Sequence, residues 1–215
     1  MSIGQPLRLA DIDSLDFAKS AGLLPAIVQH ALSGAVLMVG YMNREALRET
    51  LSGHRVVLFS RSKQRLWKKG ETSGHFLELE EVRTDCDRDA LLVTARPVGP
   101  VCHLGTVTCF GNEPITAGER LAFLAMLESV IEQRIAESPQ GSYTARLFAE
   151  GPRRIAQKVG EEGLEVALAA AVETDDKVVT ESADLIFHLL VLLRSRGLSF
   201  QKVVAELESR HATKP

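Results

Sequence analysis

The chain has 215 residues, of which 45% are hydrophobic and 25% charged, and its formal net charge is −3. This composition is typical of globular domains and argues against disorder, while the near-neutral charge offers no broad basic field for nucleic acid or a membrane surface. No segment approaches the roughly 20 apolar residues of a membrane helix, and the N-terminus lacks the order of a signal peptide, so we expect a cytoplasmic protein without nucleic-acid or membrane partners.

Short apolar runs alternate with turn residues over the first hundred positions. Four of these runs predict strands, at residues 35–41, 56–60, 76–82 and 90–95. One helix interrupts them, with Asn43 as its N-cap and Gly53 as its C-terminal stop. The first part of the chain is therefore predicted to be β-rich with few helices.

A basic stretch, SRSKQRLWKKGETSG, occupies residues 60–74. Basic side chains, hydroxyls and backbone amides exposed at glycines together make a phosphate cradle, and a tryptophan can stack on a base. A solvated basic strand with a core tryptophan is the alternative. The candidate substrate-binding residues from this stretch are Arg61, Ser62, Trp67, Lys68, Gly70, Thr72 and Ser73.

Three aspartates follow the third predicted strand in the segment TDCDRD. In an extended strand Asp85, Asp87 and Asp89 would share one face and Cys86 would lie on the other. Three stacked carboxylates repel one another unless a hard cation lies among them, and oxygen ligands suit Mg²⁺. An acidic turn with a buried cysteine fits the same residues.

All three cysteines lie in the first half of the chain, at Cys86, Cys102 and Cys109. They cannot all pair within one chain, which fits a reducing cytoplasm and thiolate ligands better than a disulfide framework. Three thiolates would hold zinc and leave a fourth position for water, as in catalytic zinc sites. Three unrelated core cysteines are the alternative. His103 adjoins a cysteine and is the candidate for proton transfer, with a structural role as its alternative.

The sequence changes character after Phe110. GNEPITAGE, residues 111–119, predicts a linker, and helical periodicity continues from there to the end. The expected helices lie around residues 121–131, at 142–148 with Ser142 as cap, at 152–172 with Pro152 in the first turn, at 175–196, and from Ser199 onward. We therefore predict two domains, residues 1–112 and 113–215.

Acidic residues recur at helical spacing in two of these helices. Glu162 and Glu165 are i,i+3, Glu161 and Glu165 are i,i+4, and the next helix repeats the i,i+3 spacing with Glu181 and Asp184. Antiparallel packing would bring four or five carboxylates together, which destabilises a helix pair unless cations neutralise them. A solvated acidic face is the alternative, but apolar neighbours on both helices favour a metal site. His188, one turn beyond Asp184, is expected to be a core histidine.

Four ordered motifs, YMNREAL, SRS…LWKKGETSG, DCDRD and CH.G…CF, resemble phosphoribosyl-AMP cyclohydrolases. The resemblance implies that zinc is bound by Cys86, Cys102 and Cys109, with Cys86 donated across a homodimer interface, and that Mg²⁺ is bound by Asp85, Asp87 and Asp89. Three positions depart from the usual pattern without removing a ligand, namely Arg88, Leu104 and Thr108.

The implied reaction opens the adenine ring of phosphoribosyl-AMP. The ribosyl group on N1 makes C6 electrophilic, so water activated by zinc can attack C6 and the N1–C6 bond can open. Zinc deaminases attack adenine in a comparable way. His103 is the candidate to move the proton.

The pattern SYTARLF…GPRRIAQKVGEEGLE…ESADLIFHLL resembles phosphoribosyl-ATP pyrophosphatases, which belong to the helical nucleotide pyrophosphatases with EExxE and ExxD motifs. The resemblance implies a homodimer that completes the helical bundle, and places Lys158 near a phosphate. Mg²⁺ would neutralise the triphosphate and orient water for attack between the α- and β-phosphates. Its implied ligands are Glu161, Glu162, Glu165, Glu181 and Asp184.

Together the two resemblances imply consecutive steps of histidine biosynthesis, from phosphoribosyl-ATP to phosphoribosyl-AMP and then to the ring-opened product. They imply an α+β protein with a β-rich, barrel-like N-terminal domain and an all-α helical-bundle C-terminal domain. Two alternatives remain open: a helical domain that acts on nucleoside triphosphates in general, and a zinc-stabilised binding module without catalysis.

Overall fold

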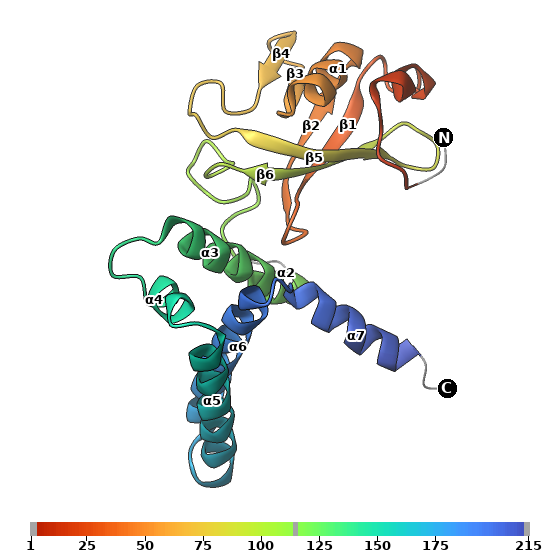
Figure 1. The fold of residues 1–215 in the computed structure, drawn as a ribbon. Helices are drawn as coiled ribbons and strands as arrows, with labels where there is room; N and C mark the ends of the chain where they lie inside the picture. The colour runs from red at the N-terminus through yellow and green to blue at the C-terminus, as the bar shows by residue number, and fades with distance from the viewer. Residues whose placement is uncertain (1–3, 114–115, 213–215) are drawn as a thin grey trace. The chain divides into compact units, whose positions relative to one another are not determined.

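The protein forms two compact units, Met1–Ala122 and Phe123–Pro215, in a computed structural model that describes residues 4–113 and 116–212. Strands dominate the first unit and helices the second (Figure 1). This confirms the predicted α+β class with a β-rich N-terminal part and a helical C-terminal part.

The first unit is built on a four-stranded sheet with the order β2-β1-β6-β5. β1 pairs antiparallel with β2 and parallel with β6, and β5 pairs antiparallel with β6. A separate hairpin of β3 and β4 joins the sheet where the Val56 amide donates to the Leu77 carbonyl oxygen at 2.9 Å. Among the described residues these ladders do not close into a barrel. The strands are β1 (Leu24–His30), β2 (Val36–Met42), β3 (Val57–Ser60), β4 (Arg65–Lys68), β5 (Leu77–Thr84) and β6 (Leu91–Pro97).

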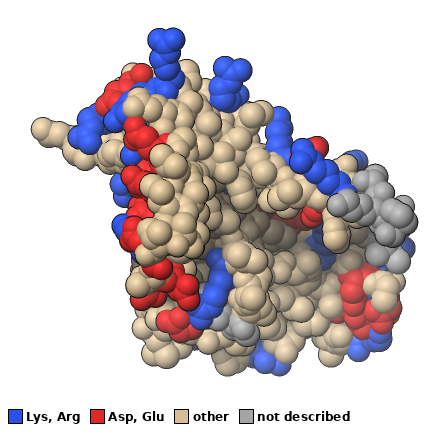
Figure 2. Space-filling view, turned by 90° about the horizontal axis from the view of Figure 1, so that it is seen from below, with Lys and Arg blue, Asp and Glu red and all other residues tan. Residues whose placement is uncertain are grey.

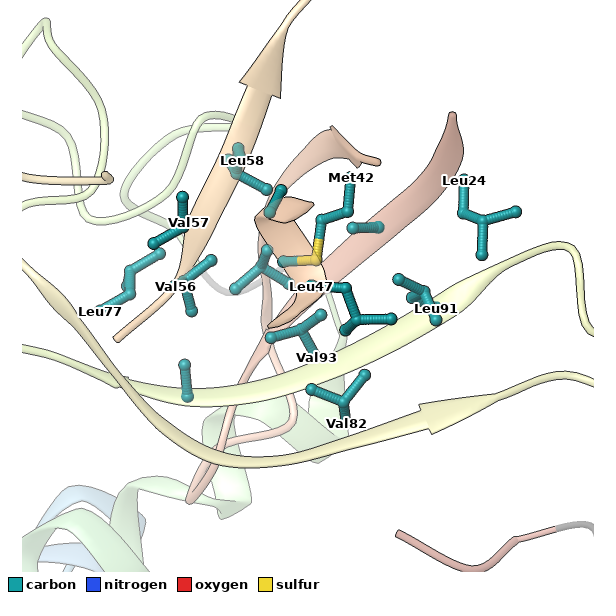
Figure 3. Packing of buried hydrophobic residues seen from close by; sticks show 14 of the residues in the cluster. Leu24, Met42, Leu47, Val56, Val57, Leu58, Leu77, Val82, Leu91 and Val93 are labelled. Carbon is teal, nitrogen blue, oxygen red and sulfur yellow. The ribbon is translucent and has the colours of Figure 1, made fainter. Parts of the chain in front are cut away.

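Helix α1 (Arg44–Gly53) covers the core of this unit. Asn43 caps it by accepting a hydrogen bond from the Ala46 amide at 2.8 Å. Leu47 is fully buried and points among side chains from the strands in the core, including Met42 and Val93 (Figure 3). The hydroxyl of Thr50 accepts a hydrogen bond from the Val57 amide at 2.9 Å, so the helix is tied to the start of β3.

The four predicted strands correspond to β2, β3, β5 and β6. The prediction missed β1 and β4, as well as a short 3-10 helix, η1 (Leu9–Ser14). β1 lies in the middle of the sheet although it contains Pro25, a residue that normally argues against a central strand. The predicted stop of α1 is also displaced by one residue, because His54 and not Gly53 takes the left-handed conformation, with φ 53°.

The second unit contains five helices among its described residues, and α5 and α6 pack side by side along their length (Figure 1). Ser142 caps α4 and Thr174 caps α6, each through its side-chain oxygen. The core side chains come from four of the helices and are Ile131, Leu147, Ile155, Leu190 and Val191. The helices are α3 (Phe123–Glu137), α4 (Tyr143–Ala149), α5 (Pro152–Val172), α6 (Asp175–Ser195) and α7 (Phe200–Ala212).

The predicted linker at residues 111–119 is only partly irregular. Helix α2 (Ala117–Leu121) begins inside it, and the Thr116 hydroxyl accepts a hydrogen bond from the Glu119 amide at 3.1 Å. Threonine followed by glutamate three residues later is a helix-start signature, which outweighed Gly118. Residues 114 and 115 of the predicted linker lie outside the described residues.

Acidic and basic side chains are interspersed on the face shown in Figure 2, with large areas of other residues between them. Ion pairs between residues one helical turn apart include Arg210 with Glu206 at 2.8 Å and Arg154 with Glu150 at 3.5 Å. None of the helices in the described part of the chain combines the length and apolarity needed to cross a membrane.

Candidate functional site

The three aspartates lie in a loop between β5 and β6 and not in the extended backbone for which a shared face is expected, so the turn of the alternative interpretation is present, although its cysteine is exposed and not buried. β5 ends at Thr84, and Arg88 in the turn has a φ of 63°. The Asp85 carboxylate accepts hydrogen bonds from the amides of Asp89 at 3.0 Å and Ala90 at 3.1 Å, which stabilises the turn in place of a strand. The turn nevertheless gathers the aspartates: Asp85, Asp87 and Asp89 each offer a carboxylate oxygen within 4.8 Å of the others.

Lys19 is the cation of this aspartate cluster, and nothing in the sequence pattern pointed to it. Its ammonium group contacts the carboxylates of both Asp87 and Asp89. These hydrogen bonds raise the pKa of Lys19 and lower the pKa of Asp87. Lys19 lies before β1, far from the aspartates in sequence, so only the fold brings the charges together.

Cys102 and Cys109 lie in the loop that follows β6. The Cys102 amide donates to the Thr106 carbonyl oxygen at 3.1 Å, and the Cys109 amide donates to the Leu37 carbonyl oxygen of β2 at 2.8 Å. Hydrogen bonds from the Leu104 amide and the Thr106 hydroxyl lower the pKa of the Cys102 thiol. Burial and the neighbouring Cys102 raise the pKa of Cys109, because a second thiolate close by disfavours the charged form.

The third cysteine is placed differently. Cys86 is exposed in the aspartate loop, and no metal-sized group of ligand atoms among the described residues includes a cysteine. His103, the predicted proton carrier, is exposed, with Nδ1 3.9 Å from the Cys102 sulfur. The structure therefore pairs Cys102 with Cys109 beside His103 and leaves Cys86 apart from them.

Part of the basic stretch lines a pocket of about 590 Å³. Arg61, Ser62 and Trp67 lie on its wall, and the Arg61 guanidinium stacks over the Tyr41 ring at 3.8 Å from the centroid. Lys68 faces a different, smaller depression, because alternate residues of β4 point to opposite faces. The structure thus groups three of the predicted substrate-binding residues and separates Lys68 from them.

The loop after β4 is shaped by Gly70. Gly70 is buried with a φ of +91°, and a Cβ there would lie 2.5 Å from backbone atoms of His75. Its carbonyl oxygen accepts a hydrogen bond from the Gly74 amide at 2.9 Å, while Thr72 and Ser73 are exposed on the turn between them. The tight turn thus presents both hydroxyls to solvent.

Lys69 also lies in the basic stretch, and its place in the structure distinguishes it from the other lysines there. It is only 7% exposed, and its ammonium group lies 5.9 Å from the centroid of the Trp67 ring. Its positive charge acts to lower the pKa of Cys109, which opposes the effect of burial on that thiol. A buried lysine is rare enough that burial, once known, marks it as a candidate.

In the second unit, α5 and α6 bring together three of the predicted carboxylates. Glu162, Glu165 and Glu181 each offer an oxygen within 4.8 Å of the others, and Glu162 and Glu181 are buried. Glu161 is half-buried and Asp184 exposed, and neither belongs to this group. The carboxylate cluster therefore has Glu162, Glu165 and Glu181 at its centre, with the other two predicted ligands on the same helices.

Two lysines offset part of this negative charge. Lys158 contacts Glu162 at 2.7 Å and Glu161 at 3.0 Å, and Lys177 contacts Glu181. Lys177 was missed, although it precedes Glu181 by four residues, a spacing that pairs side chains on a helix. These contacts lower the pKa values of Glu161 and Glu181.

The pKa of Glu165 shows that the two lysines do not fully offset the repulsion among the clustered carboxylates. The charge of Glu162, and then burial and Glu181, raise the pKa of the Glu165 carboxyl. The aspartate cluster and the carboxylate cluster on α5 and α6 each offer oxygen atoms close enough to share one ion. Such donor sets suit a hard divalent cation.

Family models match both halves of the chain. One for phosphoribosyl-AMP cyclohydrolase matches residues 38–111, and one for phosphoribosyl-ATP pyrophosphohydrolase matches residues 124–211.

Similar proteins include three named histidine biosynthesis bifunctional protein HisIE. The protein from Escherichia coli (strain K12) is 54% identical over 197 residues, covering 92% of this chain and 95% of that protein. Those from Xanthomonas campestris and Vibrio cholerae are 56% and 52% identical over 200 and 199 residues, and each match covers 93% of this chain and 94% of the relative.

Proposed function

The chain belongs to the family of histidine biosynthesis bifunctional proteins HisIE, and from this premise we propose how its two active sites work. It is a hydrolase with a phosphoribosyl-AMP cyclohydrolase domain followed by a phosphoribosyl-ATP pyrophosphohydrolase domain. The C-terminal domain acts first and releases pyrophosphate, and the N-terminal domain then opens the adenine ring of the phosphoribosyl-AMP produced. We place the division between the domains at Asn112, so that the N-terminal domain is residues 1–112 and the C-terminal domain residues 113–215.

The N-terminal site is proposed to hold zinc through the thiolates of Cys102 and Cys109 together with Cys86 of a second subunit. The effect of Cys102 on the pKa of Cys109, and the exposure of Cys86 in another loop, support this division. Zinc, when bound there, supplies the Lewis acidity that activates water for attack on C6. His103, beside Cys102, is the residue that we assign to proton transfer.

Substrate is proposed to bind along the basic stretch. Arg61, Ser62 and Trp67 share one pocket, which supports contacts to the phosphoribosyl and adenine parts of the nucleotide. Lys68, Gly70, Thr72 and Ser73 would contribute charge, backbone amides and hydroxyls from β4 and the loop after it. A second cation, Mg²⁺, is proposed at the aspartate cluster of Asp85, Asp87 and Asp89, which the gathering of their carboxylates supports.

The C-terminal site is proposed to bind Mg²⁺ at the carboxylate cluster on α5 and α6. Mg²⁺, when bound, neutralises the triphosphate and lowers the barrier to its hydrolysis. Lys158 already pairs with Glu162 and is placed to exchange that contact for a phosphate oxygen. The proposed ligands are Glu162, Glu165 and Glu181 at the centre, joined by Glu161 and Asp184.

A homodimer is proposed to complete both sites. Several large apolar residues of the α5–α6 pair are exposed, which supports a partner surface there, namely Leu164, Leu168, Val172 and Val179. We also propose a cytoplasmic location, where the cysteines stay reduced.

The shared zinc site has a direct test by subunit mixing. Cys86→Ser and Cys102→Ser proteins should each lack cyclohydrolase activity, while a mixture refolded together should recover part of it, because half of the sites in mixed dimers carry all three thiols. Pyrophosphohydrolase activity, measured on the same samples, is the control for folding. Absence of recovery would contradict the shared site.

The observation that carries the assignment of the second site is the approach of Glu162, Glu165 and Glu181 between two helices. Purified protein should convert phosphoribosyl-ATP with Mg²⁺ to pyrophosphate and, with zinc, to the ring-opened product. A preference for ordinary nucleoside triphosphates would favour a general pyrophosphatase in the second domain. Full turnover in strong chelator would contradict both metal sites.

A further inference from the structure

His188 on α6 is a buried histidine whose two ring nitrogens have different partners. Nδ1 lies 2.9 Å from the carbonyl oxygen of Asp184 and 3.5 Å from Oε1 of Glu162, whereas Nε2 lies 2.9 Å from the hydroxyl of Tyr143. Carbonyl and carboxylate oxygens accept hydrogen bonds and do not donate them, so Nδ1 carries a hydrogen. That hydrogen is donated to the Asp184 carbonyl oxygen, and the Glu162 oxygen is a second, longer contact of the same N–H group. In the neutral ring Nε2 therefore accepts the hydroxyl hydrogen of Tyr143.

We propose that His188 is a positioning residue of the pyrophosphohydrolase site: its Nδ1–H group, bound to the Asp184 carbonyl oxygen and facing Glu162, orients Glu162 for the cation, and Tyr143 helps to hold the imidazole in that orientation. This inference rests on the proposed role of Glu162 as a metal ligand. Residues that hydrogen-bond to metal ligands orient them, and losing such a partner commonly weakens metal binding 10- to 100-fold.

Glu162 needs such a partner because it is buried among like charges. It is 5% exposed and shares a group of close carboxylates with Glu165 and Glu181. Lys158 is its other close partner, but the same ammonium group also contacts Glu161 at 3.0 Å. An N–H group that faces the carboxylate favours its charged form in this buried setting.

The imidazole is held by more than hydrogen bonds. The Phe187 ring meets it edge-on at 5.3 Å between centroids, and the Tyr143 ring does so at 6.0 Å with an interplanar angle of 83°. His188 itself is 5% exposed. Rotation of the ring by half a turn would place carbon atoms against Asp184, Glu162 and Tyr143, so the Asp184 carbonyl oxygen and the Tyr143 hydroxyl together select the orientation in which Nδ1 faces Glu162.

The same contact gives a role to the SYTARLF motif. Tyr143 is the first residue of α4, which Ser142 caps, and its hydroxyl ties this short helix to α6. Metal-site geometry thus depends on a helix that contributes no carboxylate.

Two substitutions at position 188 distinguish the roles of Nδ1 and Nε2. The amide nitrogen of asparagine lies as many bonds from Cα as Nδ1, and the amide group of glutamine reaches the position of Nε2. His188→Asn can keep the donor toward Glu162, whereas His188→Gln can keep only the partner of Tyr143. All variants would be made in the full-length, zinc-loaded chain with Asp87→Asn and Asp89→Asn. These two substitutions remove cation binding at the aspartate cluster but keep the Asp85 hydrogen bonds to the backbone. Mn²⁺ binding to the remaining site would be measured by electron paramagnetic resonance.

We expect His188→Gln to raise the dissociation constant for Mn²⁺ about tenfold and His188→Asn to change it less than threefold. Tyr143→Phe, which removes one oxygen and should fold normally, should raise it severalfold alone but add nothing to His188→Gln. Equal effects of both His188 variants, no effect of either, or additive effects of Tyr143→Phe and His188→Gln would overturn the proposal.

Glu162→Gln separates this inference from the proposed function. If that variant binds Mn²⁺ as the parent does, the metal site itself is misassigned. If Glu162→Gln loses Mn²⁺ while both His188 variants bind normally, the metal site stands and the positioning role is refuted. Thermal unfolding of each variant shows whether the helices are intact.

Discussion

Replacing Gly70 with alanine tests how the loop after β4 is built. The added Cβ would lie 2.5 Å from the carbonyl carbon and oxygen of His75 and 2.6 Å from the Phe76 amide nitrogen, at a φ of +91°. None of these atoms belongs to a flexible side chain, so the backbone must move. The left-handed conformation costs alanine about 1–2 kcal/mol, and the forced shift adds about 1–3 kcal/mol.

Gly74 supplies the matched control within the same loop. Its φ is +76°, but a Cβ there would meet nothing within 4 Å, so Gly74→Ala carries the conformational cost alone. We expect Gly70→Ala to destabilise the N-terminal unit by about 3 kcal/mol and Gly74→Ala by about 1 kcal/mol. At roughly 4–8 °C per kcal/mol for a domain of this size, the two melting temperatures should differ by about 8–16 °C.

Activity provides the second readout for this pair. Cyclohydrolase turnover should fall sharply in Gly70→Ala, because the turn presents Thr72 and Ser73, while pyrophosphohydrolase turnover of the same chain should stay unchanged. Chemical denaturation of each variant, followed by Trp67 fluorescence, measures the stability. Equal, small losses in the two variants would refute the steric reasoning.

Three further predictions concern charge and packing. In the metal-free protein the pKa of Glu165 is raised, so its repulsion of Glu162 and Glu181 is absent below the ordinary glutamate pKa of about 4.3 and grows as the pH rises through and above that value. Glu165→Gln should therefore raise the melting temperature near pH 8 but not near pH 4. A change in melting temperature that does not depend on pH would contradict this. Lys19→Met removes the cation that contacts Asp87 and Asp89, so Mn²⁺ should bind the aspartate cluster severalfold more tightly. As a control, Lys63→Met should leave the Mn²⁺ affinity unchanged in the same titration. Weaker Mn²⁺ binding in Lys19→Met would show that the lysine supports the site. Leu47→Ala empties a fully buried position and should cost about 3 kcal/mol in urea denaturation, and a cost below 1 kcal/mol would mean that α1 does not close the core.

The helices of the C-terminal unit were predictable because their signals are local. Pro152 in the first turn, Ser142 and Thr174 as caps, and the i,i+3 spacing of the glutamates all act within a few residues. α5 has the predicted bounds and α6 ends one residue before the predicted end. The approach of Glu162 and Glu165 to Glu181 follows from two amphipathic helices joined by a short turn.

The aspartate segment shows where local reasoning failed. Alternation predicts a shared face only if the backbone is extended, but the Asp85 carboxylate captures two backbone amides and Arg88 adopts a left-handed conformation. These hydrogen bonds compete with the strand, and a sequence pattern does not reveal which of the two prevails. The carboxylates meet nonetheless, by a different route.

The sequence by itself determined the residue types of both sites, their spacing, the two-part organisation and the family that these motifs resemble. Only the tertiary structure showed that Lys19 meets the aspartates, that Lys69 is buried beside Trp67, and that His188 connects Tyr143 to Glu162. The reason is physical, because helix caps and periodicity depend on neighbours along the chain. The partners of a buried or clustered charge instead come from distant segments, which only the packing of the core brings together.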